Sequence, residues 1–523
     1  MEQVTYLFED FALDPARFEL RKGAQTVAVE PQVLSVLILL VSNPDRLVSR
    51  DELVEKVWHG RIVSEAAISA RIKSARKALD DSGHEQRLIK TVHGRGFRFV
   101  GTLKLEQPIV SVGVAQPDAA SEAGALDKGV RPSIAVLPFA FHGADSPYTF
   151  LADAFPDEIL TDLARLRWLS VIARGTSFRF RGEAADPVAV GEALGARYCV
   201  TGSVTPTGSG MRFSVELVAC ADGAVVWSES LIVGADELDA ARADFVRSIV
   251  SNIDHHIPLH EANAVRGRPM YSLDAWSSFY LGYDLLFRFN RADNDYALQL
   301  LKRASDLDQN FSRAYAGLSF AHHQNYFMQY HEDHATGVAL ARDYAQRALD
   351  LDRTDPFAHF NMGRSAWVDG RLRDSIEWLD QATTLSPSYA QGLYARSWAE
   401  AVCGEFEDGE KHAREALKLS PLDPLRYAMV GTVALARLGQ GDLEKAAELG
   451  ERSARTPGAH KHIALIAAIA KQANGETEAA QGWLARAREM DPAISSAMFL
   501  KSFPFEDSAL REKVLQALGE LGA

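Results

Sequence analysis

The strongest constraint on the fold of this 523-residue chain is a spacing of 34 residues in its C-terminal half. A Leu followed by Asp or Ser stands at Leu351, Leu385 and Leu419, and Leu307 and Met490 begin similar pairs with insertions between them. Small residues and a proline recur at matched places inside the repeat. Small residues allow two antiparallel helices to approach closely, and proline marks the exit from the second helix. The spacing therefore predicts a stack of helix pairs.

A 34-residue period is typical of tetratricopeptide repeats. About six helical pairs fit between residues 274 and 492, and we expect a tetratricopeptide repeat array over 270–520 in which residues 424–458 fit the pattern imperfectly. The marks that align are Gly363, Gly370, Ser375, Leu379, Ala382 and Pro387 with Ser397, Gly404, Gly409, Ala413, Ala416 and Pro421, and with Ala468, Gly475, Ala480, Leu484, Ala487 and Pro492. The concave surface of such a solenoid is the expected binding site for protein partners.

The N-terminal part carries a different pattern, centred on residues 49–100. Ser49 and Glu52 form a capping-box pattern that begins a short helix ending near Trp58, and an apolar packing helix precedes it from Glu30-Pro31. A third helix and two strand-forming runs that meet at a glycine turn follow. Short alternating runs before residue 30 predict a small sheet. This order predicts a winged helix-turn-helix.

The third predicted helix has one apolar face and one small, basic face. The apolar residues at helical spacing are Ile68, Ile72, Ala75 and Leu79. The opposite side presents Ala66, Ala70, Lys73, Ser74 and Lys77, flanked by Arg71 and Arg76. Small side chains let a backbone approach base edges, Ser can bond to bases, and Lys or Arg neutralises phosphates. This face suits the major groove of DNA; the alternative is an ordinary solvated basic face.

The distribution of charge supports a nucleic-acid partner for this segment. The whole chain has a formal net charge of −14, yet residues 59–104 hold ten Lys or Arg against four Asp or Glu. The basic charge is thus local, as a groove-facing surface requires. His93 and Arg95, which stands between two glycines at the wing tip, can reach a narrow minor groove, although a plain structural hairpin is the alternative.

The runs Ser49 to Leu53, Val63 to Leu79 and Thr91 to Phe99 resemble the OmpR/PhoB-type effector domain. The resemblance covers about residues 1–102 and implies binding to double-stranded promoter DNA, with the third helix in the major groove, the wing in the adjacent minor groove, and subunits often on tandem half-sites. By motif match, the implied DNA-binding residues are Arg71, Lys73, Ser74, Arg76 and Lys77 on the helix and Thr91, His93 and Arg95 on the wing.

Two departures from the family pattern are visible. The family usually has Arg where His93 stands, which implies weaker insertion of the wing, or insertion that strengthens at lower pH. No receiver domain precedes the effector domain, so we do not expect control by phosphorylation of a fused aspartate acceptor.

The middle of the chain predicts a linker and an α/β domain. Residues 103–131 sustain no helical or strand period and are expected to form a linker. Residues 132–258 follow the order β-α-β-α-β-β-β-α, which predicts an α/β domain. The segments Pro132 to Phe139, Val171 to Arg174 and Gly202 to Val204 resemble the TolB N-terminal-like domain, a likeness that indicates fold more than function.

The sequence lacks the signatures of enzymes and cofactor sites. No P-loop, nucleophile-elbow or kinase motif is present, and adjacent Asp157 and Glu158 face different directions on a helix. We therefore expect no catalytic residues and no cofactor. The cluster nearest to a metal site comprises His322, His323, His331 and His334. It lacks a Glu-x-x-His context and supporting Cys residues, so no metal site is expected either.

A cytoplasmic location is expected. The N-terminus has neither the basic nor the apolar region of a secretory signal. The longest apolar runs, Val36 to Val41 and Ile463 to Ala470, are far shorter than a membrane span. Three scattered Cys residues form no disulfide framework, which indicates buried, reduced thiols.

These observations predict a multidomain α+β protein: an N-terminal winged helix, a central α/β domain and a C-terminal α-helical tetratricopeptide solenoid. The chain resembles bacterial transcriptional regulators of the ToxR, CadC and HilA group, without a membrane segment. Its repeats would then contact RNA polymerase or other regulatory proteins, or another copy of the chain. Two alternatives are a repeat-based adaptor whose winged helix docks protein, and an accessory protein of a signalling enzyme such as a nucleotide cyclase.

Overall fold

The computed structural model divides into two compact units, residues 1–120 and 121–523, and each has its own hydrophobic core. The structure describes residues 5–14, 19–23, 25–27, 29, 31–42, 46–58, 63, 65–82, 84–92, 95–101, 104–106, 131–143, 147–181, 186–208, 210–331 and 334–523.

The described residues of the N-terminal unit form two antiparallel sheets and three helices. One sheet has the order β4-β3-β2-β1-β8 and comprises β1 (Thr5–Phe8), β2 (Phe11–Asp14), β3 (Glu19–Lys22), β4 (Gln25–Thr26) and β8 (Lys104–Glu106). The other, the wing sheet, has the order β5-β7-β6 and comprises β5 (Val48–Ser49), β6 (Ile89–Val92) and β7 (Gly96–Phe99). The helices are α1 (Pro31–Val41), α2 (Arg50–Trp58) and α3 (Glu65–Ala78). β8 lies in the stretch expected to be linker and pairs with β1.

The local patterns explain these elements. Ser49 begins α2 by accepting a hydrogen bond from the Glu52 backbone N–H at 3.1 Å, as the capping-box pattern predicts. α1 is apolar around most of its circumference and is buried through Val36, Leu37 and Leu40. The predicted winged helix is therefore confirmed in its order of helices and strands.

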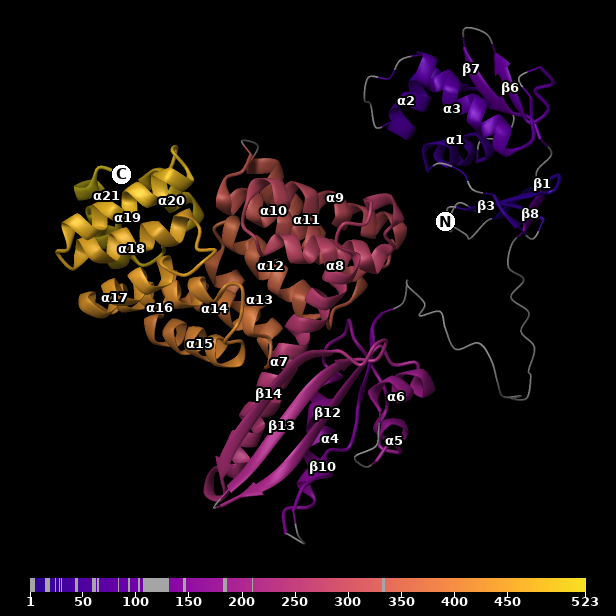
Figure 1. Cartoon of the computed structure of the whole chain (residues 1–523). Helices are drawn as coiled ribbons and strands as arrows, with labels where there is room; N and C mark the ends of the chain where they lie inside the picture. Colours follow the sequence, from indigo (N-terminus) through magenta and orange to yellow (C-terminus); the bar gives the residue numbers. More distant parts are fainter. Residues whose placement is uncertain are drawn as a thin grey trace. The chain divides into compact units, whose positions relative to one another are not determined.

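The central domain is a mixed sheet with helices on both faces (Figure 1). Its strands are β9 (Ser133–Val136), β10 (Ala140–Phe141), β11 (Ser170–Val171), β12 (Tyr198–Thr207), β13 (Gly210–Ala219) and β14 (Val225–Gly234), in the order β11-β9-β12-β13-β14 with β10 beside β12. Its helices are α4 (Leu151–Leu163), α5 (Arg174–Ser177), α6 (Pro187–Leu194) and α7 (Leu238–Val265). Phe155 of α4 and Ile249 of α7 pack in one core cluster, and Val190 of α6 packs in the other. The predicted α/β order is confirmed, with β10 and α5 added.

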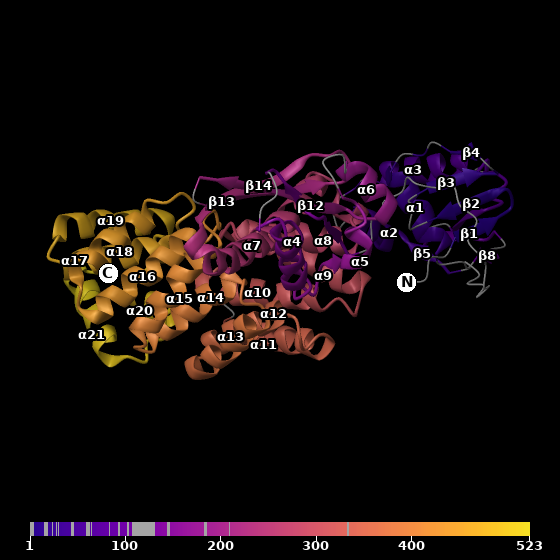
Figure 2. The ribbon, with the colours of Figure 1, turned by 90° about the horizontal axis from the view of Figure 1, so that it is seen from below.

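Six helix pairs follow, as the 34-residue spacing predicts (Figures 1 and 2). They are α8 (Ala275–Leu286) with α9 (Arg291–Leu307), α10 (Ser312–Met328) with α11 (His334–Leu351), α12 (Pro356–Val368) with α13 (Leu372–Leu385), α14 (Ala390–Val402) with α15 (Phe406–Leu419), α16 (Arg426–Gln440) with α17 (Leu443–Ala454), and α18 (Lys461–Ala473) with α19 (Thr477–Met490). Two further helices follow the pairs, the short α20 (Ser496–Ser502) and α21 (Ser508–Leu521). Small residues sit where the helices of a pair meet: a Cβ on Gly363 would come within 2.6 Å of Leu379.

The central domain and the repeats belong to one compact unit. α7, the last helix of the domain predicted over 132–258, continues past that boundary to Val265 and packs against α8. The indole N–H of Trp168 donates to the Asp254 carboxylate at 2.7 Å, and the Arg313 guanidinium of α10 lies 5.5 Å from the Trp168 ring. Because side chains from both parts interlock, the α/β domain is not an independently tethered module.

The segment 496–505 packs across the first helices of several repeats. The Ser502 hydroxyl donates to the Phe327 carbonyl oxygen at 2.7 Å, and the Trp367 indole N–H donates to the Ser502 carbonyl oxygen at 2.9 Å. Phe503 lies 5.1 Å from the Trp398 ring. This segment contributes to the burial of α10, α12 and α14 on nearly all sides. The surface expected to bind protein partners is thus covered here by the chain itself.

The cysteines are free and buried, as expected, although two of them lie together: the Cys220 thiol donates to Cys199 Sγ at 3.3 Å. In the part of the chain that the structure describes, no helix combines the length and apolar character needed to span a bilayer. Nor do three or more potential metal ligands gather among those residues.

Candidate nucleic-acid interface

α3 is fixed in the N-terminal core by its apolar face. Ile68, Ile72, Ala75 and Leu79 are all buried, as their spacing predicts. α3 packs against α1, so its opposite face is directed away from the core. The helix that carries the candidate DNA-binding residues is therefore held rigidly.

The outward face of α3 carries exposed cations. Lys73 and Lys77 are exposed, and Ser74 between them is half-buried. Within the described residues, neither lysine makes an ion pair. Arg71 is half-buried and its Nε donates to the Gln32 side-chain oxygen of α1 at 3.2 Å. Two free ammonium groups one helical turn apart, with a small hydroxyl between them, form a surface suited to a phosphate backbone and base edges.

Arg76 faces the wing. Its Nη2 donates to the Ile89 carbonyl oxygen at 2.7 Å and to the Thr91 hydroxyl at 2.8 Å, and its Nε donates to the same carbonyl at 3.2 Å. Partial burial lowers the pKa of this guanidinium. The Thr91 backbone N–H donates to the Gln86 side chain at 2.7 Å. The structure thus brings Arg76 and Thr91 together in a bond that joins α3 to β6.

The wing is a hairpin whose tip presents Arg95. Arg95 is exposed, and its backbone N–H donates to the Val92 carbonyl oxygen at 3.0 Å to close the turn. Gly96 follows with φ of 147°, and a Cβ there would lie 2.1 Å from the Val48 carbonyl oxygen. Only glycine therefore permits β7 to pair with β5 at this point. His93 lies outside the described residues.

A second pair of cations on the wing was not identified from the sequence. Lys90 of β6 is the register partner of Arg98 on β7, so both side chains leave the same face of the wing sheet. Lys90 is exposed and Arg98 is half-buried, while Ile89, Phe97 and Phe99 are buried on the other face. The alternation Phe-Arg-Phe in β7 was the available signal. Like charges placed opposite each other disfavour the free sheet and favour an anionic partner.

A buried carboxylate that the sequence reasoning missed holds the start of the wing. Asp81 follows α3 and accepts hydrogen bonds from the backbone N–H groups of Arg87 at 2.8 Å, Leu88 at 3.1 Å and Ile89 at 3.0 Å. Its own N–H donates to the Arg76 carbonyl oxygen at 2.9 Å. An acidic residue just after a helix and before a strand is the only signal that points to this role. Asp81 therefore sets the orientation of β6 relative to α3.

Two exposed ion pairs tie the N-terminal sheet to the same loop. Lys22 Nζ lies 2.6 Å from an Asp80 carboxylate oxygen, and Arg87 pairs with Glu9. These contacts join the β1–β2 turn, through Glu9, and the end of β3, through Lys22, to the segment that leads into the wing. The negative charges of Asp80 and Glu9, which lie beside the basic surface, are thus each paired with a cation.

Two family models match the chain. Residues 24–99 match "Transcriptional regulatory protein, C terminal", and residues 130–250 match "HilA/YgeH-like transcriptional regulator, second domain". The chain joins an OmpR/PhoB-type effector domain to a HilA-like second domain. The order of the two matches confirms this part of the predicted composition of the chain.

Several named proteins are similar to this chain in sequence. The transcriptional regulator HilA of Salmonella typhi is 23% identical over 424 residues, which cover 80% of this chain and 70% of HilA. PhoB of Escherichia coli, the phosphate regulon regulatory protein, is 30% identical over 92 residues, 17% of this chain and 40% of PhoB. The putative adenylate cyclase 3 of Rhizobium meliloti is 27% identical over 239 residues, and the chain spans 41% of its length.

Among solved structures, the RstA DNA-binding domain of Klebsiella pneumoniae in complex with the RstA box is 26% identical. The match covers 18% of this chain and 96% of the RstA chain, with a TM-score of 0.17. PilF of Pseudomonas aeruginosa is 15% identical over 43% of this chain and 95% of its own, with a TM-score of 0.31.

Proposed function

We propose that the chain is a bacterial transcriptional regulator that binds promoter DNA through α3 and the wing. The observation that carries the proposal is the set of exposed cations Lys73, Lys77, Lys90 and Arg95, which make no ion pair among the described residues. They project from a segment of net positive charge in an otherwise acidic chain. A DNA-binding domain needs such a local excess of positive charge. Promoter binding also places the protein's action in the cytoplasm.

In this proposal, the predicted DNA-binding residues have different roles. Lys73, Ser74 and Lys77 would meet the major groove, with Arg71 at the edge of the same surface. Arg95 and, by sequence, His93 would approach the minor groove. Lys90 and Arg98 add a phosphate-facing pair. Arg76 and Thr91 would act by holding the wing at a set angle to α3, because their hydrogen-bonding groups already meet each other.

Salt dependence of DNA binding by the full chain tests this proposal. Release of counterions makes DNA affinity fall steeply between about 50 and 200 mM salt, and each lost phosphate contact reduces the slope by about 1. We expect Lys73→Ala with Lys77→Ala to weaken binding to any duplex and to flatten the slope by about 2. Lys445→Ala, a change of an exposed lysine in α17, is the matched control. Salt-independent binding, or no retention of DNA in a gel shift, would contradict the proposal.

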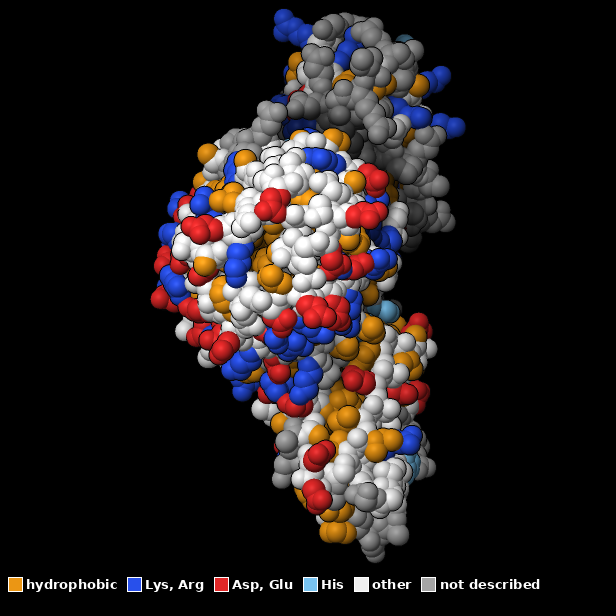
Figure 3. Space-filling view, turned by 90° about the vertical axis from the view of Figure 1, so that its left-hand side faces the viewer, with side chains coloured by type: hydrophobic (Ala, Val, Ile, Leu, Met, Phe, Trp, Pro, Cys, Tyr) orange, Lys and Arg blue, Asp and Glu red, His pale blue; other side chains and the backbone are white. Residues whose placement is uncertain are grey.

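The C-terminal unit is proposed to receive regulatory protein contacts, with RNA polymerase and a second copy of the chain as candidate partners. Segment 496–505 covers the first helices of the repeats, so such partners would meet the outer helices or displace this segment. Lys, Arg, Asp and Glu side chains are intermixed over the repeat face in view, as in polar protein-binding surfaces (Figure 3). Analytical ultracentrifugation with and without operator DNA separates self-association from a monomer that binds other proteins.

A second candidate function is that of an accessory protein beside a nucleotide cyclase. The likeness to the putative adenylate cyclase 3 favours it. Co-purification of a cyclase with the full chain, together with salt-independent weak DNA binding, would support this role. Footprinting across the genome would support the regulator and would also reveal whether half-sites are arranged in tandem.

A further inference from the structure

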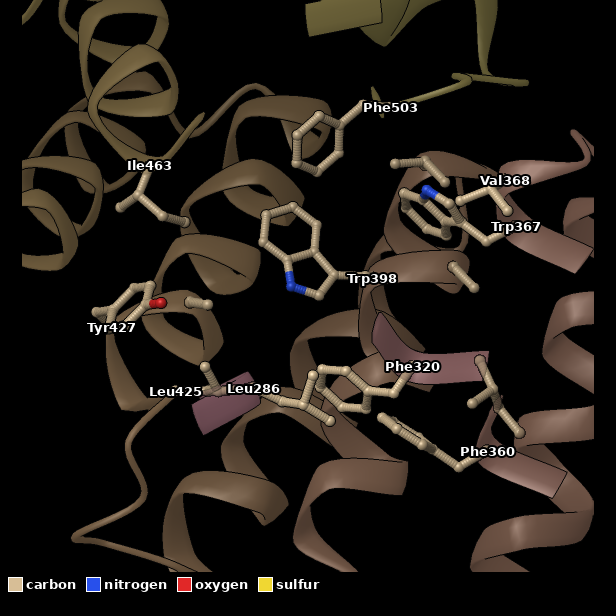
Figure 4. Close-up of a cluster of buried hydrophobic side chains, with 14 of the residues drawn as sticks. Leu286, Phe320, Phe360, Trp367, Val368, Trp398, Leu425, Tyr427, Ile463 and Phe503 are labelled. Carbon is tan, nitrogen blue, oxygen red and sulfur yellow. The ribbon is translucent and has the colours of Figure 1, made fainter. Parts of the chain in front are cut away.

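A cavity of about 60 Å³ lies inside the repeat array. Aromatic side chains from successive repeats surround it, and Phe503 of the C-terminal segment adds a further wall (Figure 4). The aromatic and aliphatic lining residues include Phe360, Trp367, Trp398, Ile463 and Phe503. In the close-up, Trp367, Trp398 and Phe503 gather above Phe320 and Phe360. The cavity is roughly large enough for a few waters or an organic molecule of a few carbon atoms.

A cation without a counter-ion lines this apolar cavity. The Arg364 guanidinium lies 3.8 Å from the Phe320 ring centre and 5.1 Å from that of Phe360. Its Nη2 donates to His323 Nδ1 at 2.8 Å. None of the ion pairs among the described residues involves Arg364. Burial lowers the pKa of Arg364 to about 10, so the group remains protonated at neutral pH.

This lack of a carboxylate distinguishes Arg364, which is half-buried, from Arg313, which is buried in the same repeats. Arg313 lies 3.9 Å from the Asp355 carboxylate and is close to aromatic rings as well. A buried charge without a partner is costly, and proteins normally pair such groups. Cation–π contacts offset only part of that cost.

Further polar atoms of the cavity lining lack partners. Arg364 Nη1, Ser375 Oγ and His460 Nδ1 are buried and make no hydrogen bond within the described structure. Buried polar groups are nearly always bonded, and each exception calls for a physical reason. Three such atoms on residues that line one small cavity indicate a binding site for a ligand that carries a hydrogen-bond acceptor.

We propose that this cavity binds a small organic monocarboxylate, whose carboxylate pairs with Arg364 and whose apolar part lies against Trp367, Trp398 and Phe503. Guanidinium groups match carboxylates in geometry and charge. The aromatic walls favour an apolar tail over a strongly hydrated inorganic anion. The volume excludes nucleotides and drug-sized molecules, which need about 300 Å³ or more.

Binding would link the C-terminal segment to the repeats. Trp367 and Trp398 belong to α12 and α14, whereas Phe503 follows α20, so one ligand contacts both parts. A monocarboxylate would therefore hold segment 496–505 against the first helices of the repeats. This site lies in the C-terminal unit and does not depend on DNA binding by α3.

Thermal unfolding of the full chain in butyrate tests the proposal, with butyramide as the uncharged probe and ionic strength held constant. We expect butyrate to raise Tm by about 2–4 °C with saturation, because a ligand that binds only the folded state stabilises it. Butyramide should not do so. Arg364→Met should abolish the rise, whereas Arg347→Met, a change of an exposed arginine beside the Tyr315 ring, should leave it intact.

A second variant keeps Arg364 and fills the cavity. Ala395 lines it and is half-buried, so Ala395→Leu should occupy the space and abolish the response to butyrate even if Arg364→Met fails to fold. The proposal is overturned if butyrate produces no saturable rise beyond that of butyramide. It is equally overturned if Ala395→Leu responds as the unaltered chain does.

Discussion

The Arg76 guanidinium donates to the Thr91 hydroxyl at 2.8 Å, which joins the candidate recognition helix to the first strand of the wing. The same guanidinium donates twice to the Ile89 carbonyl oxygen. A helix and a hairpin that approach two grooves of one duplex need a fixed mutual angle, and this bond supplies it. A positively charged residue of a basic surface, here Arg76, can thus fix the helix relative to the wing rather than contact phosphate.

Arg76→Ala should lower both stability and DNA affinity. The change removes three hydrogen bonds and leaves the Ile89 carbonyl without this donor, so we expect a loss of about 1–3 kcal/mol in the free energy of unfolding. Urea denaturation and a gel shift at fixed salt measure the two effects. Lys77→Ala, the matched control, should lower affinity without changing stability, since its side chain is exposed. Unchanged stability in Arg76→Ala would contradict the positioning role.

Asp81→Ala should destabilise the wing more than Asp80→Ala. The Asp81 carboxylate accepts three backbone N–H groups, and its removal leaves the buried Leu88 and Ile89 donors unpaired at a cost of about 1–3 kcal/mol. Asp80 is exposed and pairs with Lys22, and its φ of 50° is a left-handed value that Ala adopts less readily than Asp, so Asp80→Ala should cost about 1 kcal/mol. Hydrogen exchange of the β6 amides reports the difference. Equal protection of these amides in the two variants would show that Asp81 does not hold β6.

Periodic features of this fold could be predicted from the sequence, whereas contacts between distant segments could not. The spacing of Ile68, Ile72, Ala75 and Leu79 correctly predicts the buried face of α3, because burial on a helix follows its period. Arg76 lies at the border of that face. Whether it turns outward or toward Thr91 depends on where the wing packs, which no local pattern encodes.

In the repeats, too, periodic features could be predicted from the sequence and contacts between distant segments could not. The 34-residue spacing predicts the helix pairs because each pair packs mainly on its neighbours. Phe499, Phe503 and Phe505 were visible in the sequence as a run of aromatic residues after the last repeat. The packing of Phe503 against α10 and α14 could not be predicted, since these contacts join segments more than a hundred residues apart.

Acid should destabilise the repeats partly through His462. Burial, and then the charge of Lys461, lower the pKa of His462 to about 3, and His460 lies beside it. An unfolded histidine has a pKa of about 6.5, so the stability associated with the neutral ring is complete above that pH and is lost as the pH falls toward 3, by up to about 1.4 kcal/mol per pH unit.

His462→Gln tests this pH dependence, because Gln keeps a donor for the Phe327 carbonyl oxygen, 3.0 Å from His462 Nε2, and removes the titration. Urea denaturation between pH 7.5 and 5 should show a smaller loss of stability in the variant than in the unaltered chain. Histidines far from His462 whose pKa is also lowered by burial, such as His255 and His322, contribute equally to both proteins and cancel in the difference. Parallel stability profiles would contradict the prediction.

Phe503→Ala should release the C-terminal segment from the repeats. The Phe503 ring lies 5.3 Å from Phe327 and 5.1 Å from Trp398, and the residue is 2% exposed. Truncation of a buried Phe costs about 3–5 kcal/mol, and here it also exposes the aromatic residues of α10 and α14 that Phe503 covers. We expect a loss of stability of that size in urea denaturation, together with increased binding of a hydrophobic dye under native conditions.

Phe150→Ala, at a residue that is 58% exposed, is the matched control and should change neither measurement. If Phe503→Ala lowers stability but leaves dye binding at the control level, segment 496–505 remains docked without its central ring, and the covering of the first repeat helices rests on the Ser502 hydrogen bonds instead.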